Sequence, residues 1–379
     1  MPRSMRIAFL DSWLQDAASG SGTAVAIGGL AAALIARGHS VERLVPRGAW
    51  PRALLRRRLW FNLTLPARLR QLQRRAPYDL IVGFDIDGVR LASMPGLPYV
   101  CSIKGVLAEE ARCEQGGPRR MLAGLALLER RHARRAPLVL STSRYCIERI
   151  RHHYGVAPER LALVPEGIDL SLWQPVNDPA LLAAADAQRD PFTVLCVARQ
   201  YPRKRIRDLI EAFAIVSRQE PRAQLVIIGD GPEHASLQER RQTLGLQGCV
   251  QLLGALPDDA EVRAWYGRSA VFCLPSEQEG FGIVFLEAMA SGLPVVSTTA
   301  AAIPEVVPDG EAGLLVPRRD PPALAAALLR LLQDPSLQTR LRQAGRRHAR
   351  AYGWEAVADR FLEAVAPLLA APLRDPARR

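Results

Sequence analysis

Two glutamates eight positions apart, Glu279 and Glu287, frame the part of the sequence with the most specific chemistry. Glu279 opens a loop with glycines at 280 and 282, and Glu287 lies about one turn inside a helix expected from Ile283 to Gly292. Glycines let a ligand approach the backbone closely, and the free N–H groups at the start of a helix attract an anion. Helical side chains lean towards the N-terminus, so we expect the Glu287 carboxylate beside this anion site.

A carboxylate next to an anion site is repelled by the bound anion, so it must bind a different group. The vicinal hydroxyls of a ribose suit Glu287, and Glu279 can accept hydrogen bonds from a second polyhydroxylated group. These features together indicate a sugar nucleotide, in which a diphosphate joins two polyhydroxylated groups.

The cations that balance a diphosphate are expected in another loop of the same domain. Arg199 and Lys204 follow an apolar run at 192–198 and precede a helix. They can neutralise the phosphates and stabilise the charge that develops on a leaving diphosphate. The sequence has only one other lysine, Lys104, among 50 Lys and Arg residues. Because nearly all basic residues of the chain are arginine, a lysine suggests a site that needs a compact ammonium group rather than a planar guanidinium.

Apolar runs of strand length alternate with helical segments along the whole chain, and the pattern occurs twice. Strands buried on both faces and joined by helices require parallel sheets. We therefore predict an α/β protein with two Rossmann-like domains, whose ligands bind outside the carboxyl ends of the strands, in a cleft between the domains. The predicted domains are 1–175, with a returning helix at about 354–379, and 176–353.

Several stretches together resemble a known family. They are the loop at 20–23, STSRYCIERI at 141–150, VPEGIDL at 164–170, VARQYPRKR at 197–205, IIGDGPE at 227–233, the Glu279/Glu287 pair, GLPVVST at 292–298 and IPEVVPDGEAGLLVP at 303–317. The chain resembles the group 1 glycosyltransferases, family 4 of the sugar-nucleotide-dependent enzymes, which have the GT-B fold. The match is dense in the second half and looser between about 46 and 136.

The resemblance implies a retaining hexosyltransferase that uses a UDP-, GDP- or other nucleotide sugar without a metal or a covalently bound cofactor. Arg199, Lys204, Glu279 and Lys104 would form the catalytic set. The family's crossing C-terminal helix would correspond to residues 354–370. The donor-binding set would be Gly22, Gly229, Gly231, Gly280, Phe281, Gly282, Ile283, Val284 and Glu287.

One residue departs from the family pattern. Members of the family commonly have a histidine after the strand that LPYVCS forms here, and this chain has Lys104 at that place. We expect Lys104 to contact an anionic part of the acceptor or donor. Glu110, which could instead pair with Lys104 or simply begin an exposed helix, and Asp85, which could instead form a turn, complete the predicted acceptor-binding set.

The net charge of +12 lies almost entirely in the first half of the chain, where residues 1–185 have 26 basic and 15 acidic side chains. Arginines at 56–58 and 74–75 alternate with Leu, Trp and Phe, which suits an amphipathic helix at a membrane surface or a solvated helix with packed arginine stems. Neither a secretory signal nor a membrane span is recognisable. We predict a cytoplasmic protein, peripheral on the inner face of the plasma membrane, with a lipid-linked or polysaccharide acceptor and a role in cell-envelope polysaccharide biosynthesis.

Two other classes of function fit the sequence less well. A sugar-nucleotide epimerase of the same fold needs paired acid and base groups, and no such histidine-rich constellation is visible. Nucleic-acid binding rests on the pI of about 10.1 alone, without a recognisable module. The six cysteines form no CxxC pair and are expected to be reduced, mostly buried residues.

Overall fold

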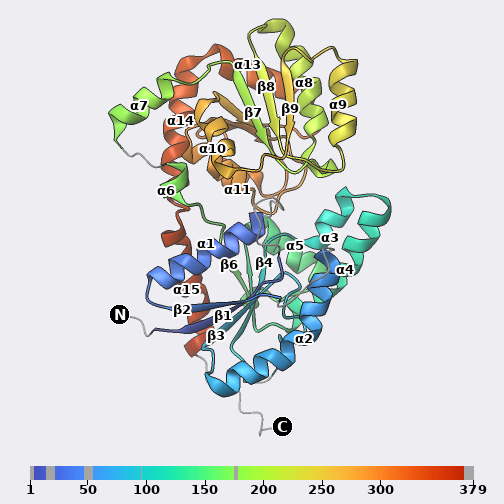
Figure 1. Cartoon of the computed structure of the whole chain (residues 1–379), viewed down its shortest axis with the longest axis vertical. Coiled ribbons are helices and arrows are strands. Elements are labelled where there is room, and N and C mark those ends of the chain that lie inside the picture. The colour runs from blue at the N-terminus through green and yellow to red at the C-terminus, as the bar shows by residue number, and fades with distance from the viewer. Residues whose placement is uncertain (1–3, 14–21, 47–53, 95, 175–177, 371–379) are drawn as a thin grey trace. The chain divides into compact units, whose positions relative to one another are not determined.

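The computed structural model describes residues 4–13, 22–46, 54–94, 96–174 and 178–370, and the chain divides into two compact units (Figure 1). Unit 1 is the chain up to Gly167 together with the segment from Trp354 onwards, and unit 2 is Ile168–Gly353. The first unit therefore ends earlier than position 175, where the sequence places the boundary. The reason is that Ile168 already belongs to the second unit, where its N–H donates to the Tyr352 carbonyl at 2.9 Å.

Unit 1 contains a six-stranded sheet in the order β2-β1-β3-β4-β5-β6, and all its strand pairs are parallel. The strands are β1 (Arg6–Leu10), β2 (Ser40–Leu44), β3 (Leu80–Phe84), β4 (Tyr99–Ile103), β5 (Leu138–Ser141) and β6 (Leu161–Leu163). The central strands β3 and β4 are buried along their whole length, as their continuous apolar sequences require.

Helices cover both faces of this sheet. The helices are α1 (Gly22–Ala36), α2 (Leu54–Arg75), α3 (Leu107–Glu110), α4 (Gly116–Arg135), α5 (Arg144–Tyr154) and α15 (Trp354–Ala370). Ala8 and Leu10 of β1 share a core with α2 and α5, whereas Ile7 and Phe9 share a second core with α1 and α15. Because successive strand residues point to opposite faces, the two cores lie on the two sides of the sheet.

The returning helix α15 is fixed to unit 1 by its first residue. The Trp354 indole lies against Gly29 of α1 and Gly167, so closely that a Cβ at Gly29 would be 2.1 Å from the ring. Phe361 of α15 packs edge-on against Phe9 of β1, with ring centroids 6.5 Å apart. The C-terminal segment thus completes the core of the first unit.

Unit 2 repeats the architecture, with a parallel sheet in the order β12-β11-β10-β7-β8-β9. Its strands are β7 (Thr193–Val197), β8 (Gln224–Ile228), β9 (Val250–Gly254), β10 (Val271–Cys273), β11 (Val295–Thr298) and β12 (Gly313–Val316). Its helices are α6 (Leu170–Trp173), α7 (Pro179–Ala187), α8 (Ile206–Gln219), α9 (His234–Thr243), α10 (Asp259–Arg268), α11 (Ile283–Ala290), α12 (Ile303–Val306), α13 (Pro321–Gln333) and α14 (Pro335–Arg350).

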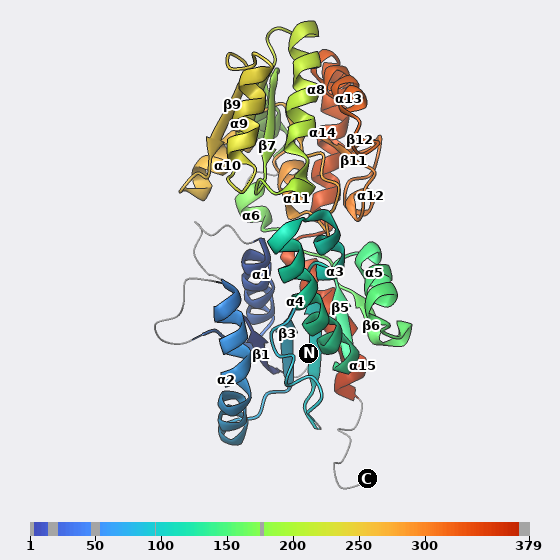
Figure 2. The ribbon, with the colours of Figure 1, turned by 90° about the vertical axis from the view of Figure 1, so that its right-hand side faces the viewer.

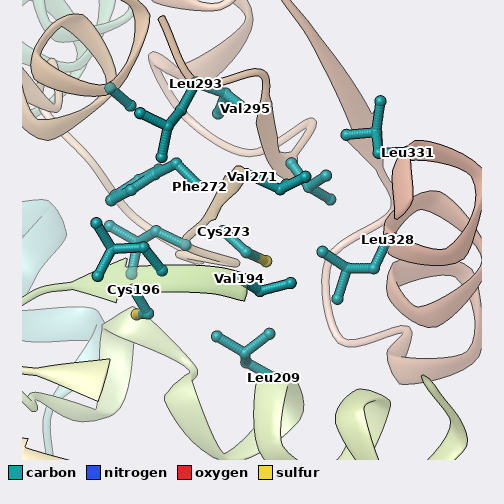
Figure 3. Close-up of a cluster of buried hydrophobic side chains, with 14 of the residues drawn as sticks. Val194, Cys196, Leu209, Val271, Phe272, Cys273, Leu293, Val295, Leu328 and Leu331 are labelled. Carbon is teal, nitrogen blue, oxygen red and sulfur yellow. The ribbon is translucent and has the colours of Figure 1, made fainter. Parts of the chain in front are cut away.

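One part of the core of unit 2 lies between its sheet and the helices α8 and α13, which pack side by side (Figure 2), and another part includes Phe285 of α11 and Leu341 of α14. Val194, Cys196 and Cys273 from the strands meet Leu209 of α8 and Leu328 of α13 in this core (Figure 3). Both cysteines are fully buried and unpaired, as the sequence predicts. The two parallel sheets with helices around them confirm the predicted α/β fold class with two Rossmann-like domains.

Candidate functional site

The loop between β10 and α11 positions the first predicted glutamate. Glu279 is 7% exposed, and its Oε1 atom accepts a hydrogen bond from the Ser276 hydroxyl at 2.7 Å. The Ser276 carbonyl in turn accepts a hydrogen bond at 2.6 Å from the hydroxyl of Thr298, the last residue of the neighbouring strand β11. Glu279 is therefore held at the carboxyl edge of the sheet rather than projecting freely into solvent.

Glycine is required where this loop turns into the helix. Gly282 has a φ of 94°, and a Cβ there would lie 2.6 Å from the Phe285 ring. Among the described residues no side chain caps the helix that begins at Ile283, and of its first-turn N–H groups that of Phe285 donates to the Gly282 carbonyl at 3.0 Å. Ile283 and Val284 are partly exposed at this point, and Phe281 is buried. The start of α11 therefore keeps the properties of an anion site.

Lys204 reaches Glu279 from a different loop. The lysine ends a short 3₁₀ turn between β7 and α8, Pro202–Lys204, and its Nζ atom lies 2.6 Å from Glu279 Oε1. The two loops are also joined through the backbone, because the Glu277 N–H donates to the Arg203 carbonyl at 2.8 Å. The structure thus brings two of the predicted catalytic residues into direct contact.

Arg199 follows β7 and is exposed, with its guanidinium carbon 6.0 Å from the centroid of the Tyr201 ring. Gly229 and Gly231, after the adjacent strand β8, pack tightly against the same loop. A Cβ at Gly229 would lie 2.0 Å from the Ala198 carbonyl oxygen, and one at Gly231 would lie 2.7 Å from that of Gln200. These glycines fix the loop that presents Arg199.

Glu287 lies on α11 and is partly buried. Its Oε2 atom accepts a hydrogen bond from the Tyr266 hydroxyl at 3.1 Å, and the Tyr266 ring is buried and stacked on Phe272. Burial raises the pKa of Glu287 to about 7, although the Tyr266 hydrogen bond opposes this change. Among the described residues, Glu287 forms no hydrogen bond or ion pair with Lys204 or Glu279. No feature of the sequence had indicated Tyr266.

The predicted acceptor residues lie in unit 1, after strands β3 and β4. Lys104 is almost completely buried, and its Nζ atom forms an ion pair with Glu166 Oε2 at 3.1 Å. Its N–H donates to Asp85 Oδ1 at 3.0 Å. Burial raises the pKa of Glu166, and the opposing effect of Lys104 is smaller. The pairing partner of Lys104 is thus Glu166, in the VPEGIDL motif, while Glu110 lies partly buried with its Oε1 near Gly105.

Asp85 is 5% exposed and lies in the left-handed region with a φ of 55°. Its Oδ2 atom accepts from the Trp13 indole at 3.2 Å and lies 3.7 Å from the Arg58 guanidinium. Arg58, a member of the basic cluster that the sequence places on a solvated or membrane-facing surface, is itself buried. The prediction that the Arg58 side chain faces solvent or a membrane is therefore wrong, because its guanidinium group pairs with the carboxylates of Asp85 and Asp87 at the sheet edge.

Gly22 is exposed at the first turn of α1, and its neighbours Gly20 and Ser21 lie outside the described residues. Within the described part of the chain, no group of three or more histidine, cysteine or acidic side chains could hold a metal ion.

The fold and the carboxyl-edge residues define a protein of the GT-B class. Residues 180–348 match the family model of glycosyl transferases group 1, and residues 20–172 match that of Glycosyltransferase Family 4. An MMP alpha-(1->4)-mannosyltransferase of Mycolicibacterium hassiacum is 31% identical over 299 residues, which are 75% of this chain and 69% of that protein. The chain belongs to the group 1, family 4 glycosyltransferases.

Two solved structures show the same fold. Sucrose-phosphate synthase from Thermosynechococcus elongatus superimposes with a TM-score of 0.79 at 24% identity, over 97% of this chain and 100% of that one. HepE of Anabaena, in complex with UDP-glucose, gives a TM-score of 0.70 at 21% identity, over 96% and 100% of the two chains. The chain spans about half the length of the curated D-inositol 3-phosphate glycosyltransferases that it matches.

Proposed function

We propose that the protein is a retaining glycosyltransferase that moves a hexosyl group from a nucleotide-sugar donor to an acceptor without using a metal ion. The observation that carries the proposal is the contact between Lys204 and Glu279 at the carboxyl edge of the unit 2 sheet, next to the uncapped start of α11. A cation, an acceptor of hydroxyl protons and free helix N–H groups are the elements that a sugar diphosphate requires.

Each side chain then has a role that its chemistry allows. Lys204 and Arg199 bind the diphosphate and stabilise its growing charge as the glycosidic bond breaks. Glu279 and the backbone at Phe281 and Gly282 hold the sugar, and Glu287 accepts hydrogen bonds from the ribose hydroxyls. The bound UDP-glucose in the structurally similar HepE supports a nucleotide sugar as the donor class.

We infer further that unit 1 binds the acceptor, a lipid-linked saccharide or a growing polysaccharide, at a membrane surface. Support comes from two basic helices of this unit. The outer face of α2 exposes Trp60 to 55% and Leu63 to 57%, between arginines 56 and 74–75. Six arginines of α4 are exposed around Leu127, and its one acidic residue, Glu129, is buried. Basic faces with exposed apolar side chains suit an anionic interface.

Membrane attachment in this proposal is peripheral. None of the described helices combines the length and the apolar character needed to cross a bilayer.

A thermal-shift screen against a panel of UDP- and GDP-sugars tests the donor class. A ligand that binds only the folded state at about 100 times its Kd adds about 2.7 kcal/mol of stability. We therefore expect a rise in Tm of several degrees with one nucleotide sugar, and a much smaller rise for Arg199→Ala. Failure of every sugar nucleotide to raise the Tm of the native protein would remove the proposed function.

A further inference from the structure

The Lys204 ammonium group has a carboxylate partner, Glu279, in the structure. Its Nζ atom lies 2.6 Å from Glu279 Oε1, and the two side chains are 15% and 9% exposed. At this separation and in this environment the two charges attract each other more strongly than an exposed pair does. A diphosphate that is to use Lys204 must therefore compete with Glu279.

A second hydrogen bond holds the Glu279 carboxylate beside Lys204. The Ser276 hydroxyl donates to the same Oε1 atom, and the Ser276 backbone is anchored by Thr298. A hydrogen-bonded carboxylate cannot move away without losing this bond. If it stays, it repels the incoming phosphate, because both groups are negatively charged.

We propose that Glu279 is a removable counter-ion for Lys204, and that this exchange makes the site prefer a nucleotide sugar over the free nucleoside diphosphate. The inference rests on the proposed function and adds a specificity role to it. With a nucleotide sugar, Lys204 pairs with the diphosphate, and the sugar hydroxyls donate to the Glu279 carboxylate in place of Lys204. With a nucleoside diphosphate alone, no such donor is present, so the loss of the ion pair and the repulsion between anions are not compensated.

The same exchange affects product release. After transfer of the sugar, the nucleoside diphosphate loses the group that satisfied Glu279. Lys204 then pairs with Glu279 again, which promotes release of the product. Glu279 thereby acts on product release as well as on the sugar.

The same loop provides a matched control. Glu277, two positions earlier, pairs with Arg319 through contacts of 2.5 and 3.1 Å, and it has no ion pair with Lys204 among the described residues. Glu277→Gln removes one negative charge from the same loop, as Glu279→Gln does. A general change in the electrostatic field affects both variants, whereas loss of the counter-ion affects only Glu279→Gln.

The test is calorimetric titration of the native protein, Glu279→Gln and Glu277→Gln with UDP, GDP, UDP-glucose and GDP-mannose. For Glu279→Gln we expect the nucleoside diphosphate to bind about tenfold more tightly, because Lys204 is no longer occupied by a charged partner. The corresponding nucleotide sugar gains little, so the preference for the sugar form falls by a similar factor. Glu277→Gln should keep the native preference.

Ser276→Ala gives a second, independent variant, which leaves both charges in place and removes only the anchor of Glu279. It should shift the preference in the same direction by a smaller factor. Equal or weaker binding of nucleoside diphosphate to Glu279→Gln than to the native protein would overturn the inference while leaving the proposed function intact. If the native protein binds none of the four nucleotides, the proposed function fails as well.

Discussion

At the scale of single residues, the state of Glu287 depends on its surroundings rather than on its position in the motif. An exposed glutamate has a pKa of about 4.3. Burial raises the pKa of Glu287 to about 7, and the Tyr266 hydroxyl stabilises the charged form. Near neutral pH the side chain is therefore divided between an acid and a carboxylate. Only the carboxylate offers two full acceptors to ribose hydroxyls.

We expect donor binding to strengthen as the pH rises through about 7, the region in which Glu287 loses its proton. Glu287→Gln should lower kcat/KM by roughly 30- to 150-fold at pH 8 and flatten this profile, because a charge-assisted hydrogen bond is lost. Steady-state kinetics between pH 5.5 and 8.5, at fixed ionic strength, provide the measurement.

Tyr266→Phe serves as the matched variant for this pH profile. It removes the hydroxyl that favours the carboxylate, so the midpoint should move upward. The folded state binds the Glu287 proton more tightly than the unfolded chain does. The contribution of this group to stability is thus fully present below about pH 4.3 and is lost as the pH rises through about 7. An unchanged midpoint in Tyr266→Phe would contradict the assigned hydrogen bond.

At the scale of elements, one carboxylate joins α7 to α14 and, through Arg189, to the ends of α10 and α11, the helix that carries Glu287. Asp186 of α7 forms two hydrogen bonds with Arg346 of α14, at 2.7 and 2.8 Å, and one with Arg189 at 3.0 Å. Arg189 donates to the Tyr266 and Ser269 carbonyls at the end of α10, and also to the Ser291 carbonyl at the end of α11. Cations at helix C-termini satisfy carbonyls that have no partner within the helix.

We expect Asp186→Asn to destabilise the second unit by about 3 kcal/mol, since it leaves partly buried arginines without their counter-charge. Urea unfolding, followed by tryptophan fluorescence, measures the change. Arg207→Gln, which breaks an exposed ion pair with Glu211 on α8, should cost only about 0.3 to 0.5 kcal/mol. Similar losses for the two variants would show that the arginine cluster is not a structural anchor.

At the scale of the whole molecule, the uneven distribution of charge along the chain is the property that bears on membrane binding. The excess of basic residues in the first half of the chain lies on a unit whose helices α2 and α4 expose arginines beside apolar side chains. Each arginine near an anionic bilayer contributes about 1 kcal/mol to binding. The second half carries almost no net charge and offers an internal comparison.

Replacement of three exposed arginines of α2, Arg56, Arg74 and Arg75, by glutamine should weaken binding to vesicles containing phosphatidylserine roughly 100-fold. Arg58 stays unchanged in this test, since it is buried against Asp85 and Asp87. Liposome flotation at 0.1 M salt measures the change, and the triple variant Arg207, Arg218 and Arg347 to glutamine in unit 2 serves as the charge-matched control. Equal flotation of both triple variants would refute a membrane face on α2.

The amino-acid sequence by itself determined the fold class. Continuous apolar runs of strand length, joined by helical segments, can be buried only in parallel sheets covered on both faces. The residues that follow those strands were also recognisable, because the carboxyl ends of parallel strands share one edge. That Lys204 and Glu279 share this edge follows from the same rule, although they lie 75 positions apart, and their direct contact was seen only in the structure.

Only the tertiary structure decided which groups are buried and what they pair with. Lys104 forms its ion pair with Glu166, 62 positions away, and Glu287 receives its hydrogen bond from Tyr266 on a different helix. Arg58 lies inward although its neighbours Arg56 and Trp60 are exposed. The charge state and availability of a side chain depend on the local dielectric and on its partners, and both arise from packing between segments whose contacts leave no pattern along the chain.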